Sequence, residues 1–384
     1  MLISLAIAFA ALYMLDRMWK MATIVHFFRH AYPPEPQVRS TLSLIQPVTD
    51  SPNDLRAVLA LRAQKLYPGK VEQIIIFDAE DTRSQDICRS VMAQFVSWQP
   101  KIVLAQDVGI AMKTVKQLAG LERATGEVVC FVDDDILLRP ETLPSLVRYL
   151  QAGTGATFGL ACYTNWQTLW GGLMSAFVNA NVLLNYIPVT YLTNPYTITG
   201  HIYAMSRTNF DAVGGLTGMA QRLDDDHELA RRVMRGGLLN CQTPAIYDVD
   251  NHLSTLTAFL AQMKRWFVFP RETMLPGTSL RQQILTMAAS LPNLLPGFIL
   301  LVALVQPAAW LALAVCLLVF YTIYIWSTQA YLKCRTPLWA WPLLLLVAVV
   351  LPFLILVLLF SDSTIQWRGQ KIHVKRGGEY EIID

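Results

Sequence analysis

One long stretch of the chain is almost without charge. Between Gln282 and Ser361, only Lys333 and Arg335 are charged. The rest of the 384-residue chain carries nearly all of its 31 basic and 28 acidic side chains, as an ordinary globular domain would. The uncharged stretch excludes a purely soluble enzyme, and the charged remainder excludes a transporter embedded throughout the membrane. The sequence therefore predicts a water-facing domain joined to a membrane module.

Three apolar segments in this part of the chain are long enough to cross a hydrocarbon layer of about 30 Å. They are Ile284–Gln306, Ala308–Trp326 and Leu338–Phe360. We expect transmembrane helices within residues 280–361 and a polar tail at 362–384. Prolines interrupt the first segment, so its early part is expected to break or to lie at the membrane surface.

The N-terminal segment is also apolar, but Leu2–Leu15 is short for a crossing. No small-residue cleavage site follows it; charged residues and a second apolar run do. We expect residues 1–30 to form a retained membrane anchor, with a cleaved signal peptide as the alternative.

Basic residues give conflicting predictions for the C-terminal tail. Lys333 and Arg335 mark their loop as cytoplasmic, and Arg29 does the same for the chain after the anchor, which places the water-facing domain at the cytoplasmic face. Three complete crossings would put the tail on the opposite side. Yet the tail contains four basic residues: Arg368, Lys371, Lys375 and Arg376. Either one apolar segment is not a full crossing, or the tail breaks the rule.

Between about Thr41 and Val132, within a water-facing domain expected over residues 40–275, short β-rich runs alternate with helical patterns. The predicted strands are Leu42–Pro47, Val71–Phe77, Ile102–Ala105 and Val128–Val132. The predicted helices are Asn53–Leu66, Ser84–Phe95 and Met112–Ala124. This alternation indicates an α/β fold with a mostly parallel, doubly wound, Rossmann-like sheet. Ligands on such sheets bind at the carboxyl ends of the strands.

Acidic residues follow two of these strands. Asp78 follows the second, and Asp133, Asp134 and Asp135 follow the fourth. Two carboxylates two residues apart can share a hard divalent cation, and Mg²⁺ typically binds one or two protein carboxylates together with phosphate oxygens. The position after an apolar strand favours this interpretation over a solvated acidic turn.

A second acidic triplet, Asp224, Asp225 and Asp226, precedes a charged helical pattern. Helix capping would explain it, because Asp is common at helix starts. The capping and catalytic interpretations are compatible. A carboxylate held at a helix start and pointing outward can accept a proton from a hydroxyl group.

Gln262, Arg265 and Trp266 share one face of a predicted helix, at spacing i, i+3 and i+4. An arginine can neutralise a departing phosphate, and a tryptophan offers a flat surface for a sugar or a lipid. The alternative is an interfacial helix whose Arg and Trp anchor to lipid headgroups.

The segment Trp166–Leu192 is apolar and aromatic but contains several asparagines. A transmembrane helix here would bury these amides in lipid, which is costly. We expect residues 160–195 to lie along the membrane, to face lipid, and to form a wall of an acceptor site. Ordinary domain core is the alternative.

The ordered set of Asp78, Asp133-Asp134-Asp135, Asp226 and Gln262-x-x-Arg265-Trp266 resembles the inverting GT-A glycosyltransferases, and most closely the ceramide glucosyltransferase family. The resemblance covers nearly the whole chain and includes further segments: Gln46-Pro47, Val108-Gly109-Ile110, Gly214-Gly215-Leu216 and Ile365-Gln366-Trp367-Arg368-Gly369. It implies a membrane enzyme with a GT-A domain that moves one sugar from a UDP-sugar, with UDP-glucose favoured, to a ceramide-like lipid.

The resemblance also implies a donor site. Asp78 would contact the uracil or ribose, with Lys113 nearby, while Asp133 and Asp135 would hold Mg²⁺ or Mn²⁺ against the diphosphate. Three residues would bind the diphosphate and close the acceptor side: Gln262, Arg265 and Trp266.

For the acceptor, the resemblance implies that Asp226 is the general base, with Asp225 where the family often has Glu. Trp166, Trp170 and His201 are further candidates on the acceptor side. The helix start is expected to lower the pKa of Asp226. One base without a nucleophile suffices for a single displacement with inversion.

Three alternatives stay open. A hopanoid N-acetylglucosaminyltransferase belongs to a very similar family. A processive polysaccharide synthase also contains Gln-x-x-Arg-Trp, but it needs more membrane helices than this chain offers. A receptor or scaffold with a degenerate sugar-nucleotide fold is disfavoured by the retained site residues. The net charge of +3 does not indicate a nucleic-acid partner, and the six cysteines form no C-x-x-C pair.

Overall fold

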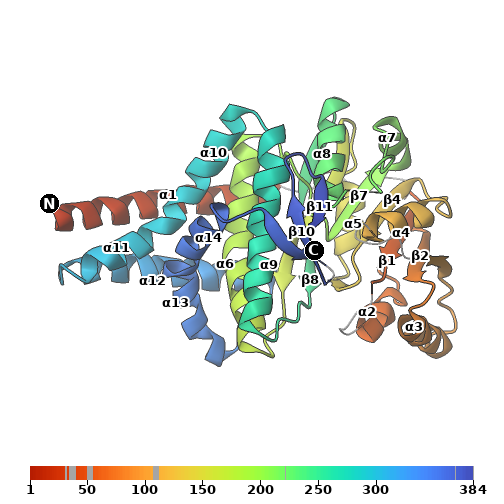
Figure 1. The fold of residues 1–384 in the computed structure, drawn as a ribbon, viewed down its shortest axis with the longest axis horizontal. Helices are drawn as coiled ribbons and strands as arrows, with labels where there is room; N and C mark the ends of the chain where they lie inside the picture. The colour runs from red at the N-terminus through yellow and green to blue at the C-terminus, as the bar shows by residue number, and fades with distance from the viewer. Residues whose placement is uncertain are drawn as a thin grey trace.

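The computed structural model describes residues 1–30, 33, 40–49, 55–106, 112–220, 222–367 and 369–383. At its centre is an eight-stranded mixed sheet with strand order β3-β2-β1-β4-β7-β6-β8-β5, and apolar helices extend to one side of it (Figure 1). The strands are β1 (Leu42–Pro47), β2 (Val71–Asp78), β3 (Lys101–Ala105), β4 (Val128–Val132), β5 (Ile136–Leu138), β6 (Thr154–Tyr163), β7 (Ile202–Ser206) and β8 (Leu239–Val249). The helices of this part are α2 (Leu55–Arg62), α3 (Thr82–Gln94), α4 (Met112–Leu121), α5 (Thr142–Arg148), α7 (Arg207–Ala212), α8 (Asp225–Arg235) and α9 (Leu256–Phe269).

Strand β2 explains why this half of the sheet could be predicted. Its side chains alternate between two buried clusters: Ile74 and Ile76 pack with Met112 of α4, while Ile75 and Phe77 pack with α2 and α3. A strand covered on both faces consists of a continuous apolar run, as parallel strands do. The mostly parallel α/β fold is thereby confirmed.

The sheet becomes mixed beyond β4. Strands β3, β2, β1 and β4 are mutually parallel, and β6 is parallel to β8, whereas β7 runs antiparallel to both β4 and β6. Each of the four predicted strands matches an observed one to within a residue. The helix after β1 ends at Arg62, earlier than predicted, and an irregular segment that contains Pro68 and Gly69 leads from it to β2. Its predicted first residue, Asn53, lies outside the described residues.

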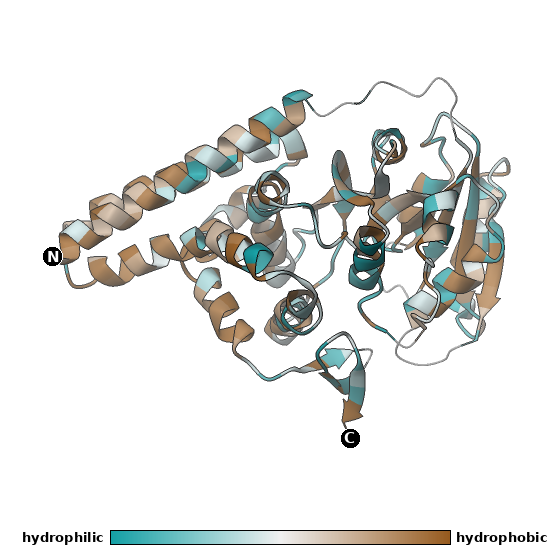
Figure 2. Ribbon diagram, turned by 90° about the horizontal axis from the view of Figure 1, so that it is seen from above, coloured by the Kyte–Doolittle hydropathy of each residue, from teal (hydrophilic) through white to brown (hydrophobic). Residues whose placement is uncertain are grey.

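Four helices of the described chain are long and apolar enough to cross a membrane, or five if one bent pair counts as a crossing. The four are α1 (Leu2–His30), α6 (Leu169–Leu192), Leu280–Ala303 and Ala309–Leu332. The third consists of α10 (Leu280–Ser290) and α11 (Leu295–Ala303), joined by a short turn at Pro292, where the interruption was expected. The fourth begins as α12 (Ala309–Ser327). Hydrophobic residues dominate the helices that lie beside the N-terminus (Figure 2).

Charged residues of α1 are buried against α10 and the turn after it. Lys20 donates to the Ala289 carbonyl at 2.6 Å and lies 3.1 Å from Asp16, while Arg17 donates to Asn293. Buried charges in apolar surroundings require such partners. This cluster fixes the N-terminal helix to the C-terminal membrane segment.

The bent pair consists of α13 (Trp341–Val349) and α14 (Leu351–Leu359), which meet at 47°. Before the pair, the Leu332 carbonyl accepts a 2.6 Å hydrogen bond from Arg139 of the sheet domain. After it, Ser363 accepts one of 2.7 Å from Arg271, just beyond α9. Both ends of the pair thus contact the water-facing domain, and a pair bent in this way is either a broken span or a re-entrant loop. A re-entrant loop would place the basic tail on the same side as the loop of Lys333 and Arg335.

Helix α6 is mostly covered by protein. About two thirds of its most apolar window, 67%, is buried, and it packs against β6, α1 and α13. Asn179 accepts a hydrogen bond from Tyr163 N and donates to Tyr163 O, both at 2.8 Å. Protein therefore covers much of this helix and satisfies the Asn179 amide, while the placement of residues 160–195 along the membrane stays a prediction.

The tail forms a separate antiparallel sheet. Its strands are β9 (Thr364–Trp367), β10 (Gln370–Val374) and β11 (Tyr380–Ile383). Ile365, Ile372 and Val374 pack with Val268 of α9, so the tail sheet lies on that helix.

Candidate active site

The first acidic triplet forms the loop between β4 and β5. Asp133 Oδ1 lies 2.7 Å from the Lys113 ammonium on α4. Asp134 Oδ2 accepts a 2.8 Å hydrogen bond from the Thr49 amide, so this carboxylate holds the neighbouring loop. Asp135 has no cation within ion-pair distance in the described part of the chain. Asp135 is therefore the carboxylate of the triplet that has no such partner, while Asp133 shares its carboxylate with Lys113.

Asp133 and Asp135 together fit a divalent cation. Burial, together with the charges of Asp133 and Asp134, raises the pKa of Asp135 to about 8 even though Lys113 acts in the opposite direction, so this carboxylate favours an added cation. The described residues contain no cluster of three metal-ligating side chains. Two carboxylates, with phosphate and water oxygens as the other ligands, nevertheless match the usual coordination of Mg²⁺.

Asp78, which is expected to contact the uracil or ribose, pairs with a lysine of α4. Its Oδ2 lies 2.7 Å from the ammonium of Lys116, which is fully buried and also donates to Thr49 Oγ1 at 3.2 Å. Sequence reasoning named Lys113, one turn earlier on α4, as lying near the nucleotide, and it missed Lys116. The sequence did contain a signal for Lys116: it lies three residues after Lys113, so the two lysines are neighbours on one face of the helix.

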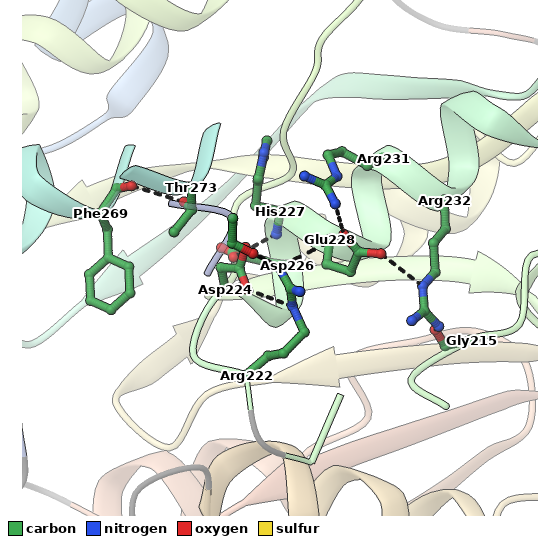
Figure 3. A network of polar contacts seen from close by, with 11 residues as sticks. Gly215, Arg222, Asp224, Asp226, His227, Glu228, Arg231, Arg232, Phe269 and Thr273 are labelled. Atoms are coloured by element: carbon green, nitrogen blue, oxygen red, sulfur yellow. Dashed lines mark hydrogen bonds and ion pairs between the residues drawn. The ribbon is translucent and has the colours of Figure 1, made fainter. Parts of the chain in front are cut away.

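The second acidic triplet begins helix α8 (Figure 3). Asp224 does not cap the helix with its side chain; its two carboxylate oxygens each accept a 2.9 Å hydrogen bond from Arg222. Asp226 accepts one of 2.7 Å from the His227 amide. Arg222, Asp224 and Asp226 thus lie in one network, as the sticks in Figure 3 show.

The pKa of Asp226 is the opposite of what the helix start led us to expect. Burial raises it to about 7, and the charge of Asp225 adds to the rise. Desolvation of the carboxylate outweighs the stabilisation by the helix terminus and the His227 amide. Asp226 is therefore a stronger base than an ordinary aspartate.

Lys113 and Gly200 connect the two triplets. The Lys113 ammonium donates to the Gly200 carbonyl at 3.2 Å in addition to pairing with Asp133. A Cβ on Gly200 would lie 2.6 Å from Asp226 Oδ2, so only glycine leaves room for this carboxylate. Burial lowers the pKa of Lys113, but Asp133, Asp225 and Asp226 together outweigh it and raise that pKa above its ordinary value.

Helix α9 contributes the three residues predicted to share a face. Arg265 donates to Gln262 Oε1 at 2.6 Å. The Trp266 ring meets Tyr163 edge-on, with centroids 6.0 Å apart. Burial lowers the pKa of Arg265. The charges of Tyr163, Asp135 and Asp133 act on it in the opposite direction. Arg265 is thus within electrostatic range of the first triplet.

His201 lies between the acidic loop and the aromatic residues. Its carbonyl accepts a 2.9 Å hydrogen bond from the Asp133 amide, and its Nδ1 lies 3.2 Å from the Tyr247 hydroxyl. Burial lowers the pKa of His201 to about 3, and the charges of Lys113 and Arg265 contribute. The imidazole is neutral at physiological pH.

Trp166 and Trp170 pack among apolar residues. Trp170 packs at 5.9 Å from Phe259 of α9, and Trp166 packs against the same large apolar cluster. That cluster also includes Tyr163 and Trp266. The structure therefore brings the predicted acidic residues, Lys113, His201, Gln262 and Arg265 to the polar site, and it places the three predicted tryptophans in the adjoining apolar layer. The Val108–Ile110 segment lies outside the described residues.

Comparisons with known proteins agree with this geometry. Residues 2–380 match the model of glycosyl transferase family 21, the ceramide glucosyltransferase family. The chain is 30% identical over 125 residues to an N-acetylglucosaminyltransferase of Bradyrhizobium elkanii; this match covers 32% of the chain and 65% of that relative. The chain therefore spans just under two thirds of that relative's length.

Among solved structures, a mannosyltransferase from Pyrobaculum calidifontis in complex with GDP-Man and Mn²⁺ superimposes with a TM-score of 0.57 at 18% identity, over 87% of this chain and 97% of that one. Glucosyl-3-phosphoglycerate synthase from Mycobacterium tuberculosis gives 0.38 at 18% identity, over 59% and 76%. The first likeness confirms the GT-A fold. The family match covers nearly the whole chain, and the chain therefore belongs to glycosyl transferase family 21 and is a glycosyltransferase.

Proposed function

We propose that this enzyme is a membrane-bound inverting glycosyltransferase that moves one sugar from a UDP-sugar, UDP-glucose above all, to the hydroxyl of a ceramide-like lipid. One observation carries the proposal. Lys113 pairs with Asp133 at 2.7 Å and bonds the Gly200 carbonyl at 3.2 Å, and Gly200 lies against Asp226. Two acidic triplets far apart in the chain thus belong to one site.

In this reaction Asp226 removes the proton from the acceptor hydroxyl, whose oxygen forms a bond to the anomeric carbon of the sugar as the bond to UDP breaks. Its raised pKa suits a general base that works near neutral pH. Asp133 and Asp135 would hold Mg²⁺ or Mn²⁺, which supplies positive charge to the diphosphate. Arg265 and Lys113 add fixed positive charge for the leaving group.

A single base with no nucleophile supports inversion. Displacement with retention needs a second carboxylate close to the anomeric carbon or an equivalent nucleophile. Asp225 is nearby, but its charge acts on Lys113, and it lies on the same helical turn as Asp226. We therefore assign Asp225 to support of the base.

The apolar layer beside the acids supports a lipid acceptor. Trp166, Trp170, Tyr163 and Trp266 belong to one apolar cluster that continues into the membrane helices α11 and α12. A hydroxyl-bearing lipid could place its headgroup at Asp226 and its chains along this layer. The same argument supports a hopanoid acceptor, and the Bradyrhizobium relative favours UDP-N-acetylglucosamine as the second candidate donor. A processive synthase is less well supported, since the described chain offers four or five candidate spans.

We also propose that the site faces the cytoplasm. The loop with Lys333 and Arg335 and the tail with Lys371, Lys375 and Arg376 both adjoin the catalytic domain. Basic residues concentrate on the cytoplasmic side of membrane proteins.

The test is a donor-by-acceptor screen with detergent-purified full-length protein. UDP-glucose, UDP-N-acetylglucosamine and GDP-mannose are each combined with ceramide, a hopanoid and diacylglycerol, and lipids are analysed by mass spectrometry. We expect ceramide that has gained one hexose, and no product from Asp226→Asn. A product from the hopanoid with N-acetylglucosamine would select the second candidate. Sugar polymer, or no glycolipid with any pair, would overturn the proposal.

A further inference from the structure

The tail sheet reaches the catalytic helix at Arg265. The Trp367 ring, at the end of β9, stacks on the guanidinium of Arg265, whose Cζ lies 5.0 Å from the ring centroid. Trp367 also meets the Phe269 ring edge-on, with centroids 5.6 Å apart. Arg265 and Phe269 are one helical turn apart, so Trp367 covers one stripe of α9.

Arg265 has little else to fix its orientation. Its side-chain hydrogen bond is to Gln262 at 2.6 Å, and no carboxylate lies within ion-pair distance of it in the described part of the chain. An arginine side chain held at one point retains considerable rotamer freedom. Stacking on an indole restricts the plane of the guanidinium while leaving its remaining N–H groups for an anionic ligand.

The chain segment that leads into β9 is tightly held. Arg271 Nη1 donates to the carbonyls of Leu359 and Ser361 at 2.9 and 2.5 Å, and Nη2 donates to Ser363 Oγ at 2.7 Å. On α9 itself, Lys264 lies 2.6 Å from Asp362. Trp367 therefore follows a linker that is fixed to the helix carrying Arg265.

The far end of the tail sheet is fixed near the catalytic base. Arg222 donates to the Gly377 carbonyl, and the Gly377 amide donates to Glu272 O at 3.0 Å. Gly378 has φ +91°, and the Asp224 carboxylate occupies the space that a Cβ there would need. The turn of the tail thus packs against the residue that precedes α8, two positions before Asp226.

We propose that Trp367 is a positioning residue for the transfer reaction, which holds Arg265 in the orientation that meets the diphosphate of the nucleotide sugar. The inference rests on the proposed function, in which Arg265 binds that diphosphate. The tail sheet is then a working part of the donor site, and the ligand class that it serves is a nucleoside diphosphate.

The test is a double-mutant cycle on Arg265 and Trp367, read as the affinity for UDP with saturating Mn²⁺ by calorimetry, which needs no turnover. We expect Trp367→Leu to weaken UDP binding by about three- to thirtyfold, the range for a partly buried cation–π pair. In an Arg265→Gln background the same change should have no further effect. Trp367→Tyr, which keeps an aromatic face, should restore most of the affinity.

The matched control is Lys375→Ala, because the exposed Lys375–Glu381 pair of 2.9 Å is in the same small sheet but not beside Arg265. It should leave UDP affinity unchanged. An equal loss from Trp367→Leu in both backgrounds, or no loss in either, would overturn the inference. If Trp367→Leu is not recovered folded, the cycle with Trp367→Met, which keeps more of the side-chain volume without an aromatic face, decides by the same criterion. A wild-type protein that binds no UDP would instead overturn the proposed function itself.

Discussion

The pH dependence of turnover tests Asp226 directly. With a pKa of about 7, roughly one tenth of this carboxylate is ionised at about pH 6 and roughly nine tenths at about pH 8. The ionised form is the base, so the rate at saturating donor, acceptor and metal should rise about tenfold across this interval. An aspartate with its ordinary pKa of 3.8 would be ionised throughout and give a flat profile.

Neighbouring histidines do not produce the same rise. Burial lowers the pKa of His201 to about 3 and that of His227 to about 4, so both are neutral over the interval. Asp226→Asn should lower the rate by about 10²- to 10⁴-fold and remove the pH dependence of what remains. Asp211→Asn, a matched change at an exposed residue of α7, should preserve both rate and profile.

The assay is release of UDP, followed continuously in detergent micelles in buffers of constant ionic strength. A wild-type profile that is flat from about pH 6 to pH 8 would refute the raised pKa. A tenfold rise that persists in Asp226→Asn would refute its assignment as the base.

Three other outcomes follow from the same geometry. Asp135→Asn should raise the Mn²⁺ concentration for half-maximal activity by about tenfold or more, because one of two carboxylate ligands is lost; an unchanged metal requirement would reject the metal site. Arg139→Met should lower the free energy of unfolding by about 1–3 kcal/mol, because Arg139 pairs with Asp248 and bonds the loop before α13; an unchanged denaturation midpoint would contradict this. Gly126→Ala should lower the free energy of unfolding by about 1–3 kcal/mol, because the added Cβ would lie 2.6 Å from the Ser43 amide nitrogen. A thermal melt with no shift in midpoint would contradict this expectation.

The first half of the sheet could be predicted because each strand is an apolar run covered on both faces. Strands β6 and β8 were not predicted, and their residues explain why. Gly155, Gly159 and Pro244 interrupt the pattern. A Cβ on Gly159 would lie 2.6 Å from the Ala245 carbonyl, so this glycine is required by the neighbouring strand and not by its own propensity.

The acidic and basic residues of the candidate site were proposed from their order along the chain, but their environments could not be predicted. Lys113 and Lys116 are one turn apart on α4, and only the fold shows that Lys116 pairs with Asp78. The pKa of Asp226 was expected to fall because a helix start is visible in sequence, whereas the depth of burial is not.

Helix α6 illustrates a further limit. Lipid tails and protein interiors are similarly apolar, so composition does not show which of the two covers a segment. Asn179 looked costly for a membrane location, yet its amide is satisfied by the Tyr163 backbone inside the protein.

The central claim is a single displacement by one base onto a lipid hydroxyl. Its most direct test is the anomeric configuration of the glycolipid made by the wild-type enzyme from an α-linked UDP-sugar, determined by proton NMR. The account predicts one β-linked sugar on each lipid. An α-linked product, or sugar delivered to water while the lipid stays unmodified, would contradict it.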